Sequence, residues 1–183
     1  MTRRSVVGAG LLVGAMVCGR TALASSAGVI DGKVRLALKG LYEHNAAARA
    51  LGEKAVAVLV FPDIVKGGLV VGGQYGEGAL VKGEKIEGHY RSVAASWGLQ
   101  AGVQTFGYAL FFMNEAALAY LERSNGWEVG VGPTLVVVDQ GASASLTTTT
   151  AKDDIYAFFF DQKGLMAGIG IQGSKITRFT PDA

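Results

Sequence analysis

The sequence is poor in the residues that cross-link a fold or bind metal. Its 183 residues include one cysteine, two histidines and three prolines. A single cysteine, Cys18, excludes a disulfide framework within the chain, and neither histidine has the spacing to further ligands that a zinc site needs. Three prolines beside 27 glycines also argue against a Pro/Gly-rich linker, so the glycines belong to ordered segments.

Charge is scarce as well. Only 17% of the residues are charged, whereas 50% are hydrophobic. This balance argues against intrinsic disorder, and the length suits one domain with a substantial core. Because no regular repeat and no linker-like segment divides the interior of the chain, we expect a single domain behind an N-terminal signal.

The first residues have the pattern of an export signal. A basic start with Arg3 and Arg4 precedes an apolar stretch at residues 6–17, which is shorter than the ~20 residues of a membrane-spanning helix. The adjacent arginines favour a twin-arginine signal, with an ordinary secretory signal as the alternative. Lipidation of Cys18 is disfavoured, because the residues before it lack the leucine and the small residue expected there.

Cleavage is expected after the A-x-A motif at residues 22–24, between Ala24 and Ser25. Residues 1–24 are then the export signal, and residues 25–183 form one domain in the periplasm. The signal contains three arginines and no acid, so its removal changes 17 basic and 15 acidic side chains to 14 and 15, a net charge of −1. That charge argues against a global basic field of the kind that binds nucleic acid.

Residues 31–51 predict the first helix, with Asp31 as its N-cap. Apolar residues recur there at spacings of three and four, opposite most of the charged side chains. The apolar positions are Val34, Ala37, Leu38, Leu41 and Ala48. This pattern predicts a helix packed on a sheet. The alternative is an amphipathic helix at a membrane, with Lys33, Arg35 and Lys39 close to the headgroups.

Strand patterns occupy most of the remaining chain, as short apolar runs or period-two alternation between Gly, Asp and Lys turns. The expected strands lie at residues 55–61, 66–81, 93–104, 108–113, 127–139, 142–150, 154–161 and 165–179. A helix from Asn114 to Arg123 interrupts them. The expected fold class is therefore α+β: a large antiparallel sheet able to curl into a barrel, an N-terminal helix and one helix between strands.

The stretch KGGLVVGGQYGEG at residues 66–78 has six glycines in thirteen positions. Glycine weakens a strand, because it loses the most entropy on ordering and offers its neighbours nothing to pack against. Even-numbered positions are nearly bare backbone, whereas odd-numbered positions have most of the bulk. Either the bare face allows tight internal packing, or it accommodates a flat apolar ligand such as a lipid.

Motifs for catalysis or cofactor binding are weak. The glycines match neither G-x-G-x-x-G nor G-x-x-x-x-G-K-[ST]. His44 and His89 lie in no recognisable metal or triad context, and the adjacent Asp153 and Asp154 suit a solvated turn. We therefore expect no metal, no cofactor and no catalytic residue. Glu77, on an otherwise apolar strand face, is the one carboxylate that could serve as an acid.

Several stretches in order along the chain are similar to one family. They are FPDIVKGGLVVGGQYGEGALV (61–81), ASWGLQAGVQTFGYALFFMNEAALAYL (95–121), VGP (131–133) and KGLMAGIGIQGSKI (163–176). From residue 29 to residue 179 the chain resembles the SYLF domain family. This family is a lipid-binding module found in bacteria and, beside other domains, in eukaryotic trafficking and actin-patch proteins.

The resemblance implies a lipid-binding surface. Eukaryotic members bind phosphoinositides and other anionic phospholipids, partly through a basic amphipathic helix at the start of the domain, and some bind actin. By this resemblance residues 31–51 are the lipid-contacting helix. The implied headgroup partners are Lys33, Arg35, Lys39, Lys66 and Lys163. For an exported bacterial protein, the anionic phospholipids of the envelope are the nearest equivalent.

The sequence therefore predicts an exported, non-catalytic domain that binds anionic envelope phospholipid and is peripherally associated with the membrane. One alternative is a periplasmic scaffold that binds another envelope protein through its glycine-rich faces. A more distant alternative is an enzyme that acts on lipid or cell wall, with Glu77 as its acid.

Overall fold

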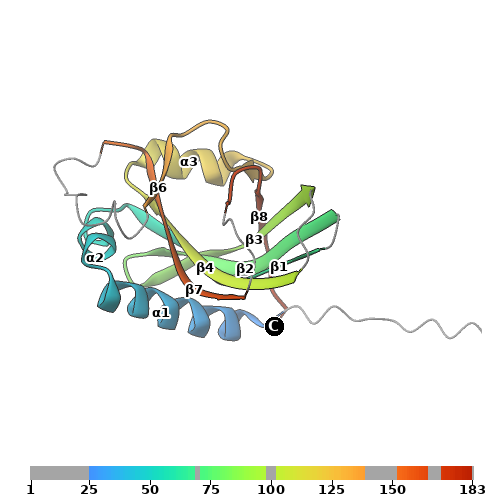
Figure 1. Cartoon of the computed structure of the whole chain (residues 1–183). Coiled ribbons are helices and arrows are strands. Elements are labelled where there is room, and N and C mark those ends of the chain that lie inside the picture. Colours follow the sequence, from blue (N-terminus) through green and yellow to red (C-terminus); the bar gives the residue numbers. More distant parts are fainter. Residues whose placement is uncertain (1–24, 69–70, 98–101, 139–151, 165–169, 183) are drawn as a thin grey trace, which may run out of the picture.

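A computed structural model describes residues 25–68, 71–97, 102–138, 152–164 and 170–182. The export motif at Arg3 and Arg4, Cys18, Ala24 and the strand expected at residues 142–150 lie outside the described residues. Three helices and a curled eight-stranded sheet make up the described part (Figure 1), which confirms the α+β fold class.

The described part begins with two helices, and a third helix interrupts the strands that follow. The elements in chain order are α1 (Ala27–His44), α2 (Ala46–Gly52), β1 (Ala57–Gly68), β2 (Val71–Lys82), β3 (Lys85–Trp97), β4 (Gly102–Phe112), α3 (Glu115–Arg123), β5 (Trp127–Glu128), β6 (Leu135–Val138), β7 (Ile155–Gly164) and β8 (Lys175–Phe179). The helix expected between strands is α3, whose N-cap Asn114 accepts a hydrogen bond from the Ala117 N–H at 2.8 Å.

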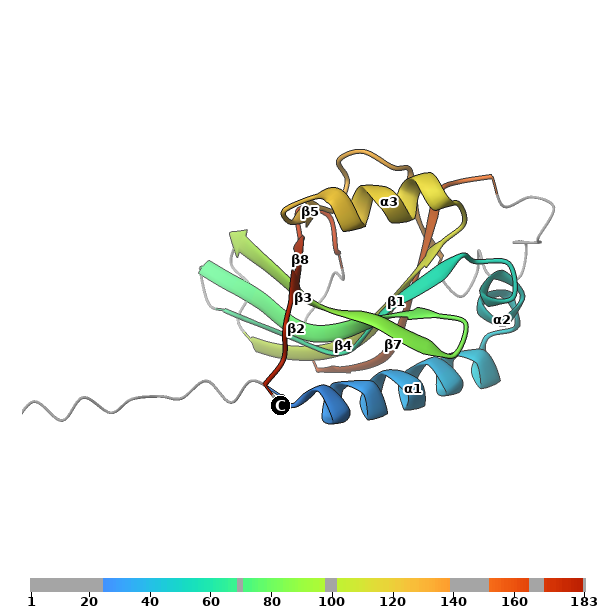
Figure 2. The ribbon, with the colours of Figure 1, turned by 180° about the vertical axis from the view of Figure 1, so that it is seen from behind.

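The sheet has the strand order β5-β8-β3-β2-β1-β4-β7-β6. All neighbours pair antiparallel except β6 and β7, which are parallel, so the expected antiparallel sheet is a mixed one. It curls into a half-barrel with α1 and α2 along its outer face and α3 on the inner side (Figures 1 and 2). The strand expected at 127–139 is divided into β5 and β6, which lie at opposite edges of the sheet.

Two apolar layers lie on the two faces of the sheet, because successive side chains of a strand point to opposite sides. The inner layer packs Phe61, Tyr108 and Phe112 against α3 and the loop that follows it. The outer layer packs Phe111 and Phe158 against α1 and α2. On α1 the predicted apolar face is confirmed: its fully buried residues are Ile30, Val34 and Leu41.

Helix α1 differs from the predicted helix at both ends. It begins at Ala27, and Ser26 in the N-cap position makes no side-chain cap bond. Asp31 is therefore not an N-cap: it lies inside the helix, and its Oδ1 is 2.8 Å from Nε2 of His89 on β3. At the other end the helix breaks at Asn45, whose Oδ1 accepts a hydrogen bond from the Ala48 N–H and caps α2. The predicted helix 31–51 is thus two helices.

The bare face of β2 faces the inner layer. Gly76 and Gly78 are in register with Ile64 and Tyr90, both buried in that layer. A β-bulge in β1 between Val60 and Asp63 presses the backbone of β1 against these glycines. A Cβ on Gly76 would lie 2.5 Å from the Asp63 carbonyl oxygen, and one on Gly78 would overlap the Val60 carbonyl oxygen. At these two positions the glycines serve tight internal packing.

We predict that Gly78→Ala lowers the free energy of unfolding by about 1–3 kcal/mol, because the new methyl group displaces the backbone of β1. The matched control is Gly73→Ala on the same strand, where the nearest atom to a new Cβ, the Ala94 carbonyl oxygen, is 3.5 Å away. Urea denaturation measures both variants. Equal stability of the two would contradict the packing role of Gly78.

Asp154 joins three parts of the fold at the start of β7. Its carboxylate accepts hydrogen bonds from the Thr134 N–H and hydroxyl, both at 2.9 Å, and from Nδ2 of Asn114 at 2.7 Å. The Thr134 N–H, followed by the side chains of Asn114 and Thr134, lowers the pKa of Asp154. This carboxylate therefore ties the N-cap of α3 to the parallel pair β6–β7, and it is not simply a solvated turn residue.

Asp154→Ala should cost about 1–2 kcal/mol of unfolding free energy at neutral pH, because three donors lose their acceptor. Since the folded-state pKa is depressed, the stabilisation is fully present above the unfolded value of about 3.9 and is lost as the pH falls through the folded pKa. Thermal melts from pH 7 to pH 2 should therefore show a smaller acid destabilisation in the variant. If the melting temperature of the variant falls with pH as much as that of the wild type, Asp154 makes no such contribution.

Candidate functional site

A groove lies beside helix α1, between that helix, α2 and the turn that joins β2 to β3. Its volume is about 430 Å³. The lining residues are Arg35, Leu38, Lys39, Tyr42, Glu43, Arg49, Val81, Gly83 and Glu84. A neighbouring hollow of about 440 Å³ shares five of them and extends the groove toward the start of β1. We refer to the two together as the α1 groove.

Helix α1 places cations at the rim of this groove because its apolar face is buried. Val34 and Leu41 anchor the helix on the outer layer of the sheet, whereas Arg35 and Lys39 are exposed. Arg35 and Lys39 are four residues apart, so they are neighbours on the helix surface. Leu38 is partly buried between them and the sheet, so the groove has a basic rim and an apolar floor.

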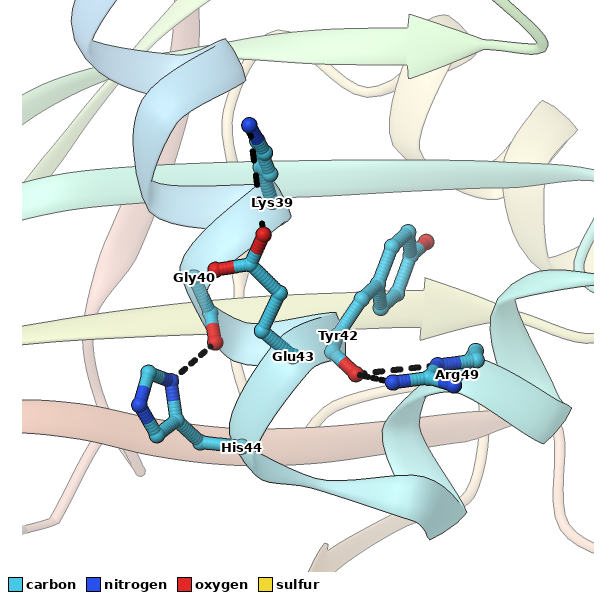
Figure 3. Close-up of polar contacts among 6 residues, drawn as sticks. All are labelled: Lys39, Gly40, Tyr42, Glu43, His44 and Arg49. Atoms are coloured by element: carbon cyan, nitrogen blue, oxygen red, sulfur yellow. Dashed lines mark hydrogen bonds and ion pairs between the residues drawn. The ribbon is translucent and has the colours of Figure 1, made fainter.

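The junction of α1 and α2 brings a third cation to the site. Nε and Nη2 of Arg49 donate to the carbonyl oxygen of Tyr42 at 3.0 and 2.7 Å (Figure 3). This carbonyl belongs to the last turn of α1, where backbone acceptors lack helical partners and the helix dipole favours positive charge. Sequence reasoning missed Arg49, because it treated residues 31–51 as one helix. Asn45 was the available signal, because asparagine favours the N-cap position and so indicates that a second helix begins after it.

Tyr42 forms the apolar wall of the groove. Its ring lies 6.2 Å from that of Phe111, and burial raises the pKa of its hydroxyl to about 12. The side chain packs so closely over Gly52 that a Cβ there would overlap the hydroxyl group. The phenol therefore stays neutral and can donate a hydrogen bond to a ligand.

The charges on α1 are only partly compensated. Nζ of Lys39 is 3.9 Å from Oε1 of Glu43, and both side chains are more than half exposed. Such an exposed pair is weak, so an incoming anion can compete for the lysine. Arg35 forms no ion pair within the described part of the chain. Glu84 also lines the groove and limits the positive potential there.

Lys33 lies on a different side of α1 from Arg35 and Lys39. Its Nζ is 2.9 Å from Oδ2 of Asp63 on β1, and this contact, together with the Asp31–His89 pair, joins the first half of the helix to the sheet. Lys33 is still half exposed. Its position suits docking of the helix better than a role in the α1 groove.

The remaining two predicted residues lie outside the α1 groove. Lys66 is only 9% exposed and lies on the inner face of the sheet, in register between Gln74 and Gln104. Lys163 is exposed on β7 and is in register with Thr105 of β4. The structure thus brings Arg35 and Lys39 together and separates Lys33, Lys66 and Lys163 from them.

Glu77 has the surroundings of a paired structural residue. Its Oε1 accepts the Tyr75 hydroxyl at 2.6 Å and lies 3.4 Å from Nη2 of Arg91. The guanidinium of Arg91 also stacks on the ring of Phe179, 4.5 Å from its centroid. The Glu77 side chain is 10% exposed. These contacts link β2, β3 and β8 on the outer face of the sheet.

Within the described ranges no group of three or more His, Cys, Asp and Glu side chains could hold a metal ion. None of the helices in the same ranges combines the length and the apolar character needed to cross a membrane. The α1 groove is one site in the described part where cations and apolar walls meet.

The described residues thus form an α+β half-barrel with a basic groove beside helix α1. Residues 93–180 match the family model Ysc84, described as Las17-binding protein actin regulator. The predicted SYLF resemblance is thereby confirmed over these residues. A comparison with curated proteins found no significant match. The matched region runs from the second half of β3 past the end of β8, so α1 and its groove precede it.

Arg49→Ala should lower the free energy of unfolding by about 1 kcal/mol, because the last turn of α1 loses two charge-assisted hydrogen bonds at an exposed position. The matched control is Lys54→Ala, an exposed cation just beyond α2, which should change stability by less than about 0.5 kcal/mol. Urea denaturation measures both. A lower free energy of unfolding in the Lys54 variant but not in the Arg49 variant would contradict the bridging role of Arg49.

Proposed function

We propose that this chain is an exported, non-catalytic domain that binds anionic phospholipid at the bacterial envelope through the α1 groove. The observation behind the proposal is the exposure of Arg35 and Lys39 on one turn of α1, directly above the apolar walls of Leu38 and Tyr42. The SYLF resemblance supports a lipid as the ligand, and the signal-like residues 1–24 support export to the periplasm.

The chemistry of the groove suits a phosphate group attached to an apolar body. The Arg35 guanidinium can hold two phosphate oxygens at once, whereas the Lys39 ammonium acts as a compact charge beside it. Each buried methylene of the lipid adds about 0.8 kcal/mol at the apolar walls. With about 1 kcal/mol for each cation near an anionic surface, binding should be weak, salt-sensitive and reversible.

A protein partner is the second candidate. The matched family is described by a protein that it binds, Las17, and by a role in regulating actin. For an exported chain the equivalent partner would be another envelope protein. Capture of one defined envelope protein that persists after lipid extraction would favour this reading over lipid binding.

We predict that Arg35→Gln/Lys39→Gln weakens binding to anionic vesicles about 30-fold, from about 1 kcal/mol for each cation. The protein is purified without detergent, its N-terminus is determined by mass spectrometry, and it is sedimented at low salt with vesicles of phosphatidylcholine or of phosphatidylcholine and phosphatidylglycerol. The matched control, Arg123→Gln/Lys152→Gln, removes two exposed cations far along the chain from α1 and should bind like the wild type.

Two results would count against the proposal. One is wild-type protein that stays in the supernatant with both kinds of vesicle. The other is binding that does not depend on phosphatidylglycerol. A control variant that loses as much affinity as the α1 variant would show that net charge, and not the groove, causes the attraction.

A further inference from the structure

A patch on the outer face of the sheet is not covered by α1. Helix α1 packs over the halves of β1 and β2 that contain Val58, Val60, Ala79 and Val81, and its first turns line a small hollow beside Asp63, Val65 and Tyr75. Beyond that point four large apolar side chains of four adjacent strands are exposed to solvent. They are Val65 (49% exposed), Tyr75 (45%), Val93 (44%) and Val103 (65%). We call this surface the outer strip.

The outer strip is continuous because its residues are in register. Val65, Tyr75 and Val93 are direct partners across β1, β2 and β3, and partners in an antiparallel pair point to the same face. In the next row Gly67 is the partner of both Gly73 and Val103. A Cβ on Gly67 or Gly73 would meet only ordinary contacts at 3.5 Å or more. The middle of the second row therefore has no side chains, and the apolar side chains of the strip project beyond it.

Cations flank the outer strip on both sides. Thr105 extends the first row on β4, and its partner on β7 is Lys163. At the opposite end the partner of Val93 is Lys175 on β8. The ten residues of the two rows include no acid. They are Lys175, Val93, Tyr75, Val65, Thr105, Lys163, Ala95, Gly73, Gly67 and Val103.

Some of the nearby acids are neutralised, whereas the exposed Asp161, two residues before Lys163 on β7, forms no ion pair within the described residues. In the adjoining row toward α1, Asp63 is paired with Lys33, and Glu77 with Arg91. Glu128 on β5 is the register partner of Lys175 on its other side. No ion pair joins these two described residues. The surface thus combines exposed apolar side chains with positive charge at its edges.

We propose that the outer strip is a second membrane contact, which rests on an anionic bilayer. Five strand spacings separate Lys163 from Lys175, about 24 Å along the row, which is too far for one headgroup but matches a surface with phosphates everywhere. Tyrosine is favoured at the membrane interface, and the three valines can enter it to a shallow depth. This inference rests on the proposed function for the identity of the ligand, but it uses different residues.

The experiment compares sets of variants on the same phosphatidylcholine/phosphatidylglycerol vesicles. Lys163→Gln/Lys175→Gln should weaken binding about 30-fold at low salt, and Val65→Thr/Val93→Thr/Val103→Thr should weaken it in high salt as well. Threonine keeps the strand preference, so these exposed changes should not unfold the sheet. The matched control, Val131→Thr/Val137→Thr, changes two other exposed valines and should leave binding unaltered.

A direct readout comes from labelling. Because Cys18 is the only cysteine, Val93→Cys and Val131→Cys in a Cys18→Ser background can each be labelled with an environment-sensitive fluorophore. On adding vesicles, the label at position 93 should shift to shorter wavelength, and the label at position 131 should not.

The outcomes separate the two proposals. Failure of the wild type to bind any vesicle removes both. Binding that is lost in Arg35→Gln/Lys39→Gln but unchanged in both strip variants, with the position 93 label still in water, overturns the outer strip and leaves the α1 groove. A dimer of the wild type that dissociates in the valine variant without a change in lipid binding would also overturn it, because the strip would then join two copies of the chain.

Discussion

The close approach of the bulged strand β1 to β2 is the constraint on which the rest of the structure depends. β1 lies near the middle of the sheet, between β2 and β4, and its bulge alters the register with both neighbours. Bulges bend a strand and increase its twist, and Gly76 and Gly78 let the partner strand follow. The bend gives the sheet an inner face that α3 closes and an outer face on which α1 lies.

The way in which α1 is held determines which part of the outer face is covered and which part is exposed. Apolar contacts through Val34 and Leu41 fix one part of the helix, whereas the pairs Asp31–His89 and Lys33–Asp63 fix its beginning. A helix docked in this way turns Arg35 and Lys39 outward. It also ends short of the last rows of the strands, so Val65 and its neighbours remain uncovered. One docking arrangement therefore produces both the basic groove and the exposed strip.

Local signals in the sequence predicted much of this fold, and contacts between distant residues explain most of what they missed. Asn114 caps α3 as expected, since an N-cap depends on residues three positions apart. Asp31 failed as a cap because its partner, His89, is 58 residues away. Period-two alternation identified the bare face of β2 but could not say which face would meet the core. The same limit applies to the cations, because only the register shows that Lys66 is buried and Lys163 lies beside Thr105.

The arrangement of acids shows how a chain with little net charge can present a cationic face. On the outer side of the sheet, Asp63 and Glu77 are used in pairs with Lys33 and Arg91 that hold helix and strands in place. These pairs are structural, and they also remove the acids that would repel an anionic surface. The cations without such partners in the described residues, Arg35 among them, then set the local field. Because exposed charges interact over only about 8 Å at physiological ionic strength, the proposed binding to an anionic surface depends on this local balance more than on the overall charge.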